Sequence, residues 1–191
     1  MFVVAGPAGS GKSSFFPLSH FGVDFFTVDD RAAELHGSYE GISPEARAQA
    51  GRDCEAFIRD HIEARRSFAV ETTLRTEVSL AQARAAHTAG FATILVYVGT
   101  DDPAINVERV RLRGLQGKHS APATLIRDIY AASLANLRRA CAVFDVVRIY
   151  DNSGPVAEHP EPVAFVDAGV VRLPPGAPAW IADALGLTHT H

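Results

Sequence analysis

The sequence predicts an α/β fold with a central, mostly parallel five-stranded sheet and helices on both of its faces. Short apolar runs alternate with longer segments of helical periodicity, which is the pattern of parallel strands joined by crossover helices. The chain has 191 residues, of which 47% are hydrophobic and 21% are charged. This length and composition suit one domain with a full core.

Composition and charge argue against several broad classes of protein. No apolar run approaches the roughly 18 to 20 residues that span a bilayer, and the N-terminus lacks the basic segment of a signal peptide. The net charge of −4 gives no support for binding to nucleic acid or to a membrane. Cys54 and Cys141 lie far apart among apolar neighbours and are expected to be buried, reduced thiols. We therefore expect a cytoplasmic protein.

The strands are predicted by short apolar runs that end at glycine or acidic residues. The first run is followed by a glycine-rich turn, the second by two aspartates and the third by a glutamate. The expected strands cover Phe2–Ala5, Asp24–Val28, Phe68–Val70, Ala92–Val98 and Asp145–Ile149.

The helices are predicted by their end signals and by apolar spacing. Ser43 is expected as an N-cap with Pro44 in the first turn, and Gly90 is expected to end a helix. Pro17 follows soon after Lys12, so the first helix is expected to be short or kinked. The expected helices begin at Lys12 and cover Pro44–Arg66, Glu77–Thr88, Pro103–Leu115 and Ala121–Cys141.

The tail that begins at Pro155 differs in character, because its prolines break up any long element. The elements expected there are a small hairpin of Val163–Val166 and Val170–Leu173 around Gly169, and a last short helix at Pro178–Leu185. We divide the chain into a core at 1–154 and a C-terminal extension at 155–191 that packs on the same domain.

One motif indicates a phosphate-binding loop. Its residues match G-x-x-x-x-G-K-[ST] in full and follow an apolar strand, although a glycine-rich turn without a ligand is the alternative. Glycines let backbone N–H groups surround phosphate oxygens, and the next helix directs its N-terminus at the same charge. Lys12 is expected to reach the β- and γ-phosphates of ATP, and Ser13 to ligate Mg²⁺. The expected nucleotide-binding residues are Gly6, Pro7, Ala8, Gly9, Ser10, Gly11, Lys12, Ser13 and Ser14.

The motif makes the predicted fold a P-loop NTPase, and three observations narrow its class. The chain is too short for most multi-element motor ATPases. It contains neither the LSGGQ-like segment of transporter ATPases nor an NKxD-type segment that reads guanine. A small kinase remains, which needs a base, acidic residues for the metal, groups that hold the acceptor, and cations for the migrating phosphoryl group.

Carboxylates at strand ends are candidates because these ends line the ligand crevice of an open α/β sheet. Asp29 and Asp30 follow the second strand and are suited to accept a proton, unless both are capping or first-turn residues of a helix. Glu71 ends the third strand like a Walker B carboxylate, with Thr72 and Thr73 beside it. A solvated strand end is the alternative for Glu71.

Glu55 is a weaker candidate in the middle of the long helix. Arg52 and Arg59 lie at i−3 and i+4, so surface ion pairing explains it equally well.

A basic run that contains glycines is a candidate lid, with an ordinary basic helix surface as the alternative. Arginine suits phosphate because of its bidentate fork. Arg109 and Arg113 share one helix face, whereas Arg111 faces elsewhere, and we favour Arg109. The full run comprises Arg109, Arg111, Arg113, Lys118 and His119.

With these pieces in order, the sequence resembles the zeta toxin family, including the small zeta-toxin-like P-loop ATPases of bacteria. The similarity runs from Phe2 to about Ser153 and depends on the joint order and spacing of short segments. Besides the P-loop, these segments are Thr-Val-Asp29, Glu55-Ala-Phe-Ile, Val-Glu71-Thr-Thr-Leu, Ala-Gly90-Phe, the strand Ile94 to Val98, Glu108-Arg109, Gly-Lys-His119-Ser-Ala-Pro122, Leu134-Ala-Asn136-Leu and Tyr150-Asp151-Asn152-Ser153.

The resemblance implies a kinase-like fold and transfer of the γ-phosphoryl group of ATP to the 3′-hydroxyl of the sugar in UDP-N-acetylglucosamine. It implies that Asp29 is the general base and that Arg109 steadies the transition state. It also implies that Glu55, Glu71 and Thr73 hold the sugar nucleotide.

One position departs from the family pattern. The family's second arginine falls on His119, which is charged only in part near neutral pH, so Lys118 is the alternative source of that charge. An antitoxin, as a separate chain, is a candidate partner that this sequence does not reveal.

The leading hypothesis is therefore an ATP- and Mg²⁺-dependent small-molecule kinase with a sugar nucleotide as acceptor. Two alternatives stay open. One is a P-loop kinase for another metabolite, a nucleoside or a nucleic-acid end, and the other is an ATP-binding regulator or ATPase without an acceptor.

Overall fold

The computed structural model describes residues 1–115, 121–155 and 159–187. Within these residues, seven strands form one sheet in the order β2-β3-β1-β4-β5-β6-β7. The strands are β1 (Phe2–Ala5), β2 (Asp24–Thr27), β3 (Phe68–Thr72), β4 (Ile94–Gly99), β5 (Val146–Asp151), β6 (Glu161–Asp167) and β7 (Val170–Arg172). The pairs among β1 to β5 are all parallel, whereas β6 and β7 are antiparallel additions at one edge.

The α/β architecture is confirmed, but the expected number of strands was wrong. The hairpin of the C-terminal tail does not stand apart; it pairs with β5 and extends the sheet from five strands to seven. Val163, Ala164 and Val166 of β6 are buried, so the hairpin adds apolar surface to the core. Its pairing also satisfies the backbone groups that β5 would otherwise expose at an edge.

The helices are α1 (Lys12–Phe15), a 3₁₀ turn η1 (Leu18–Phe21), α2 (Val28–His36), α3 (Pro44–Glu63), α4 (Val78–Thr88), α5 (Pro103–Gly114), α6 (Ala123–Cys141) and α7 (Ala179–Leu185). They follow the expected pattern with two additions, the 3₁₀ turn η1 and helix α2. The short first helix is confirmed, because α1 ends two residues before Pro17. The second strand was expected to reach Val28, but it ends at Thr27 and Val28 already begins α2.

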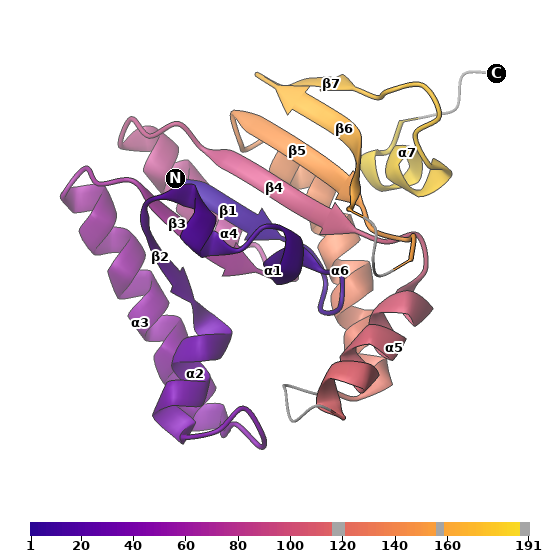
Figure 1. The fold of residues 1–191 in the computed structure, drawn as a ribbon. Helices are drawn as coiled ribbons and strands as arrows, with labels where there is room; N and C mark the ends of the chain where they lie inside the picture. Colours follow the sequence, from indigo (N-terminus) through magenta and orange to yellow (C-terminus); the bar gives the residue numbers. More distant parts are fainter. Residues whose placement is uncertain (116–120, 156–158, 188–191) are drawn as a thin grey trace.

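Helices cover both faces of the sheet (Figure 1). Alternation along β1 directs Val4 to one face and Val3 and Ala5 to the other. Val4 packs with Leu18 of η1, whereas Val3 and Ala5 belong to the main core with side chains of α3, α4, α6 and α7. Val3, Val4 and Ala5 are all fully buried, so the turn that follows β1 begins in the centre of the domain.

The free, buried state expected for Cys54 and Cys141 is confirmed. Burial raises the pKa of each thiol to about 11, so neither is a reactive thiolate near neutral pH. None of the helices in the described ranges combines the length and the hydropathy needed to cross a membrane.

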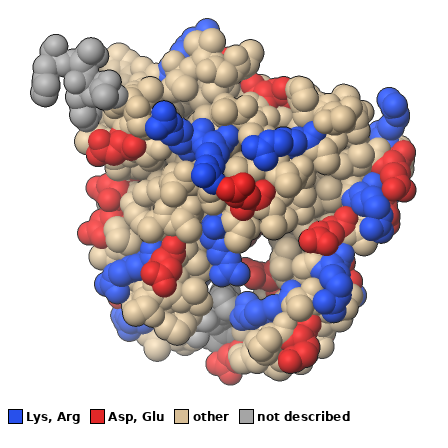
Figure 2. Space-filling model, turned by 180° about the vertical axis from the view of Figure 1, so that it is seen from behind, with Lys and Arg blue, Asp and Glu red and all other residues tan. Residues whose placement is uncertain are grey.

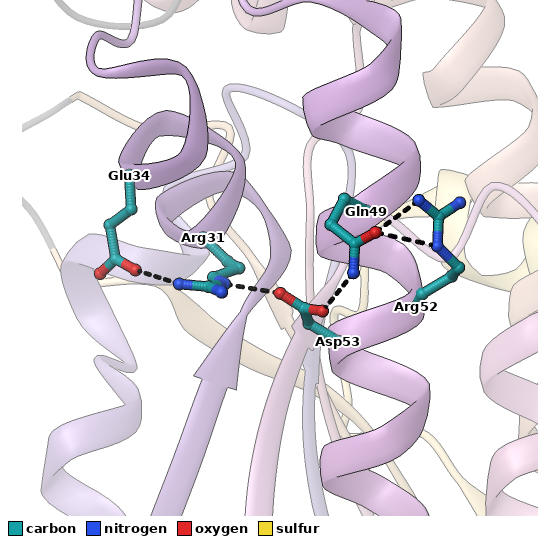
Figure 3. Close-up of polar contacts among 5 residues, drawn as sticks. All are labelled: Arg31, Glu34, Gln49, Arg52 and Asp53. Carbon is teal, nitrogen blue, oxygen red and sulfur yellow. Dashed lines mark hydrogen bonds and ion pairs between the residues drawn. The ribbon is translucent and has the colours of Figure 1, made fainter.

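A polar network fixes α2 against α3 (Figure 3). Arg31 Nε donates to Asp53 Oδ2 at 2.7 Å, and Gln49 Nε2 donates to Asp53 Oδ1 at 2.7 Å. Arg52 and Glu34 extend the network at its two ends. The hydrogen bond from Arg31 lowers the pKa of Asp53, so the carboxylate remains charged well into the acidic range. The two helices therefore form one arm beside β2.

The sheet core yields a test of the fold. Phe68 is fully buried between the rings of Phe57 and Phe91, with centroids 6.0 and 5.9 Å away. Phe68→Ala is expected to lower the free energy of unfolding by about 3–5 kcal/mol, because it leaves a cavity. Urea denaturation followed by circular dichroism measures the loss.

Phe25 provides the matched control, because it lies on the neighbouring strand β2 and is 47% exposed. Phe25→Ala is expected to cost less than about 1 kcal/mol. Equal losses in the two variants would contradict the burial assigned to β3.

Candidate active site

The phosphate-binding loop lies between β1 and α1, and three of its glycines have positive φ angles. These angles are 145° at Gly6, 82° at Gly9 and 91° at Gly11. A Cβ atom would lie 2.1 Å from the Val98 carbonyl oxygen at Gly6 and 2.5 Å from the Asn106 carbonyl oxygen at Gly9. The outer side of the loop is thus in direct contact with β4 and α5, and side chains there have no room.

Two buried asparagines hold the carbonyl groups of the loop. Asn106 Nδ2 on α5 donates to the Ala8 carbonyl at 2.8 Å, and Asn152 Nδ2, just after β5, donates to the Ser10 carbonyl at 2.7 Å. Thr100 donates its hydroxyl to Asn106 Oδ1 and so fixes the orientation of that amide. The Ser10 N–H donates to the Pro7 carbonyl at 3.1 Å within the turn. With the Ala8 and Ser10 carbonyls bonded on the outside, the other backbone N–H groups of the loop remain available to an anion.

Sequence reasoning missed Asn106, and it noticed Asn152 only through the family resemblance. A single asparagine within an amphipathic helix carries no pattern, so only the three-dimensional contact reveals its role.

The loop also contains an unpartnered buried hydroxyl. Within the described residues, Ser10 Oγ is the one buried side-chain polar atom without a hydrogen-bond partner. Its residue is 0% exposed, and leaving such a group unpaired costs free energy. Ser10 Oγ lies 2.8 Å from the position that a Cβ atom at Gly6 would take, so the hydroxyl is on the side of the loop that faces β4.

Lys12, Ser13 and Glu71 meet at the mouth of the loop. Lys12 Nζ lies 3.5 Å from Glu71 Oε1, and the Ser13 hydroxyl donates to Glu71 Oε2 at 2.7 Å. The Glu71 side chain is 16% exposed, so it is not the solvated strand end considered above. A serine hydroxyl beside a carboxylate offers the hard oxygen ligands that Mg²⁺ prefers, usually together with substrate phosphates. Ser14, the next residue, is exposed on α1.

The parallel register brings Asp29 close to this group. Thr27 pairs with Glu71, and Glu71 pairs with Val4 on its other side. Neighbouring strands lie about 4.8 Å apart, so β2 ends one strand away from the Glu71 backbone. Asp29 follows Thr27 by two residues, in the first turn of α2.

The two neighbouring aspartates differ in their contacts. Asp30 accepts hydrogen bonds from the hydroxyl groups of Thr27 and Tyr39. Asp29 is exposed and makes no hydrogen bond or ion pair with any described residue. Both are first-turn residues, as the alternative proposed, but only Asp29 has a carboxylate free to meet a ligand.

Thr73 lies in a tightly held loop after β3. The Leu74 backbone N–H donates to Thr72 Oγ1 at 3.1 Å, and Asn136 Nδ2 donates to the Leu74 carbonyl at 3.0 Å. Leu74 has a φ angle of 56° and is fully buried, so tertiary contacts fix an unusual backbone conformation. Thr73 lies between Thr72 and Leu74 in this loop, two residues after Glu71 in the sequence.

Glu55 does not form the ion pairs that its neighbours in sequence suggested. Arg52 bonds to Gln49 and Arg59 bonds to Asp60. Glu55 is exposed and lies about 200° around α3 from Asp53, on the flank away from α2. Its carboxylate is therefore free, but it is not brought into contact with Glu71 or Asp29.

Arg109 is engaged with backbone groups next to the loop. Its guanidinium donates to the Asn152 carbonyl at 2.8 Å and to the Gly154 carbonyl at 3.0 Å. Partial burial lowers the pKa of Arg109, an effect that the nearby Asp151 carboxylate opposes. Arg111 is instead paired with Glu108, and this hydrogen bond raises the pKa of Arg111.

The basic run contains three further cations. Arg113 is exposed near the end of α5. Lys118 and His119 lie outside the described residues.

Figure 2 shows, from behind, an opening between the α2–α3 side of the molecule and the α5–α6 side, with charged side chains of both signs around it. A second, shallow hollow lies at the opposite edge of the sheet. It is lined by Met1, Phe2, Arg65, Ser67, Ala89, Gly90, Phe91, Ala92 and Ile94. The residues that carry phosphate chemistry are all at the carboxyl edge, so we place the site there.

Comparison with known proteins bears on the fold. No family model matches the sequence, and no curated protein matches it. Solved structures do match. The PezAT toxin–antitoxin system of Streptococcus pneumoniae superposes with a TM-score of 0.58 and 19% identity, over 80% of this chain and 68% of that chain. The AvrRxo1-ORF1:ORF2 complex with ATP gives 0.66 and 16%, over 90% of this chain and 59% of that chain.

A gluconokinase from Sinorhizobium meliloti 1021 matches with a TM-score of 0.52 and 20% identity, over 83% of this chain and 85% of that chain. This chain has the fold of the P-loop kinases. The resemblance to zeta-type toxins is thereby confirmed for the fold. The chain spans less than two thirds of the AvrRxo1 chain, and identities below 25% carry no further function across.

The glycine contacts of the P-loop kinase fold give a paired test. Gly9 and Gly41 both have positive φ angles, of 82° and 63°, but only at Gly9 would an added Cβ atom have other atoms within 4 Å. Gly9→Ala is expected to weaken binding of ATP with Mg²⁺ by more than about tenfold, because its Cβ would displace the loop from Asn106. Isothermal titration calorimetry measures the change.

Gly41→Ala is the control for backbone strain alone, since both variants place alanine in the left-handed region. It is expected to cost some stability and leave nucleotide affinity unchanged. Wild-type affinity in Gly9→Ala would show that the loop does not need its contact with α5.

Proposed function

We propose that this protein is an ATP-dependent phosphotransferase that moves the γ-phosphoryl group to a hydroxyl of a small molecule, a sugar nucleotide such as UDP-N-acetylglucosamine. One observation carries the proposal: Glu71 contacts both Lys12 and Ser13 at the mouth of the loop, one strand away from the end that leads to Asp29. Phosphate-binding groups and an unengaged carboxylate thus share one edge of the sheet.

At the phosphate end of the site, each group has a separate proposed role. Lys12 neutralises charge on the β- and γ-phosphates, and the loop amides hold the oxygens in place. Ser13, with Glu71 nearby, would hold Mg²⁺, which supplies further positive charge to the phosphates. The AvrRxo1 complex, determined with ATP, supports ATP as the nucleotide.

Asp29 is proposed as the base at the acceptor end. The acceptor oxygen forms a bond to the γ-phosphorus while the bond from that phosphorus to the bridging oxygen of ADP breaks. The proton of the acceptor hydroxyl passes to the Asp29 carboxylate. The network of Arg31 and Asp53 holds α2 and so keeps Asp29 in place during this step.

Arg109 is proposed to balance charge on the migrating phosphoryl group, with Lys118 or His119 as the second cation. Two of its five N–H donors are used on carbonyl groups, and the others remain for a phosphate oxygen. Loss of such a cation in phosphoryl-transfer enzymes costs on the order of 10³-fold or more in rate.

Glu71, Thr73 and Glu55 are proposed to hold the acceptor. Carboxylates and a hydroxyl accept and share hydrogen bonds with the hydroxyl groups of a sugar. The net charge of −4 disfavours a nucleic-acid end as acceptor. PezAT is described as a toxin–antitoxin system and AvrRxo1-ORF1:-ORF2 as a complex. These descriptions support an antitoxin-like partner for this chain, in a cytoplasm that supplies ATP.

The match with the gluconokinase supports a second candidate acceptor. The match covers 85% of the gluconokinase chain but only 68% and 59% of the PezAT and AvrRxo1 chains. A free sugar or sugar acid is therefore the alternative to a sugar nucleotide within the same mechanism.

An acceptor screen tests the proposed activity. Purified protein with radiolabelled γ-phosphate ATP and Mg²⁺ is expected to label UDP-N-acetylglucosamine, and Lys12→Ala is expected to abolish the label. Labelling of gluconate or another sugar acid instead would favour the second candidate. Labelling of an oligonucleotide end, or release of phosphate with no labelled acceptor, would refute the proposal.

Asp29→Asn tests the assigned base. The variant is expected to lower the rate of transfer by about 10²- to 10⁴-fold, because the amide accepts no proton, while ATP binding stays unchanged. Asp30→Asn is the matched control, since Asp30 is already bonded to Thr27 and Tyr39. If Asp29→Asn turns over at the wild-type rate, or if Asp30→Asn shows the larger loss, the base lies elsewhere.

A further inference from the structure

The C-terminal helix α7 contacts the segment that supports the phosphate-binding loop. Trp180 Nε1 donates to Asp151 Oδ1 at 3.2 Å, and the Ser153 hydroxyl donates to the same oxygen at 2.6 Å. Ser153 Oγ in turn accepts from the Asp101 backbone N–H at 2.8 Å. Asp151 Oδ1 thus connects α7 to the segment after β5. Through Ser153 it also connects α7 to the loop after β4.

The ring of Trp180 occupies the space that a side chain at Gly99 would need. A Cβ atom at Gly99 would lie 2.6 Å from Trp180 Cη2. The Gly99 carbonyl accepts from the Asn152 backbone N–H at 2.8 Å. Trp180 therefore packs against Gly99, whose carbonyl binds Asn152. Its indole N–H donates to Asp151, the residue before Asn152.

Asn152 carries this contact to the phosphate loop. Its side chain donates to the Ser10 carbonyl at 2.7 Å, and a Cβ atom at Gly11 would lie 2.4 Å from its Nδ2 atom. Arg109 also depends on this segment, because it donates to the carbonyls of Asn152 and Gly154. A shift of the segment would move both groups at once.

Helix α7 is a firm support for this contact. Ile181 is 0% exposed and Leu185 is 5% exposed, and both belong to the main core. The helix lies beside the carboxyl ends of β4 and β5 (Figure 1). The C-terminal extension, which lies outside the segments that resemble zeta toxins, therefore has a defined contact with the candidate site.

We infer that Trp180 is a positioning residue for nucleotide binding. Through Asp151 it sets the orientation of Asn152, and thereby the direction of the Ser10 carbonyl and of the loop amides. The inference rests on the proposed function only in requiring that the loop binds ATP. It assigns a part in that site to the C-terminal extension.

The test removes the indole N–H and keeps an aromatic ring over Gly99. Trp180→Phe is expected to weaken binding of both ATP with Mg²⁺ and inorganic triphosphate by about three- to tenfold, since one hydrogen bond to a charged group is lost. The full chain is used, and calorimetry gives both dissociation constants. A melting curve of each variant measures stability separately.

Tyr97→Phe is the matched control. It removes the hydrogen bond between the Tyr97 hydroxyl and Ser133 Oγ, 3.0 Å apart in the core, and leaves the loop contacts alone. This variant is expected to melt at a lower temperature and to keep both dissociation constants. A purely structural role for Trp180 would give the same result as Tyr97→Phe.

Two changes at Asp151 complete the test. Asp151→Asn keeps an acceptor oxygen for Trp180 and Ser153 and is expected to bind ATP within about twofold of the wild type. Asp151→Leu is expected to reproduce the loss in Trp180→Phe.

The possible outcomes separate this inference from the proposed function. Wild-type affinities in Trp180→Phe would overturn the inference and leave the kinase proposal standing. If the Lys12→Ala variant binds ATP with Mg²⁺ as tightly as the wild type, both the inference and the kinase proposal fail. The single tryptophan of the chain also gives a fluorescence readout, which is expected to change when ATP binds.

Discussion

The active-site edge depends on how the carbonyl groups of the phosphate loop are held. Asn106 and Asn152 bind the carbonyls of Ala8 and Ser10 from the outside, across 98 and 142 residues of sequence. This support for the loop exists only in the assembled sheet, in which β4 pairs with β1 and β5 pairs with β4. The glycine-rich motif is therefore a feature of the local sequence. The orientation of its amides toward a polyphosphate depends on contacts across the sheet.

The sequence was informative where a feature is local and less so where it depends on distant contacts. The P-loop, the short α1 and the strands β1 to β5 follow from glycine spacing, Pro17 and apolar runs, and all were predicted. The joining of β6 and β7 to the sheet was not, because strand pairing across a loop leaves no local pattern. Likewise, the difference between Asp29 and Asp30 depends on Tyr39, whose hydroxyl reaches Asp30 from beyond α2.

The electrostatic arrangement at the loop explains why a carboxylate can lie beside a phosphate site. Glu71 contacts Lys12 and Ser13, so its charge is compensated in the ligand-free protein. In the proposed nucleotide complex, Lys12 would turn to the more strongly charged phosphates, and a divalent cation near the Ser13 hydroxyl would balance the charge of Glu71. A neutral side chain at this position would leave the buried ammonium of Lys12 unpaired before nucleotide binds, which costs stability.

The contacts of Arg109 bear on where the second charge for phosphoryl transfer must come from. Its guanidinium is bonded to the segment after β5, and that same segment bonds the phosphate loop through Asn152. Arg109 is therefore fixed relative to the phosphate loop. In the proposed reaction the γ-phosphoryl group would move toward the acceptor, so a cation on the acceptor side would be needed as well. Lys118 and His119 are the residues that we propose for this charge, and lysine has the advantage of a full charge at neutral pH.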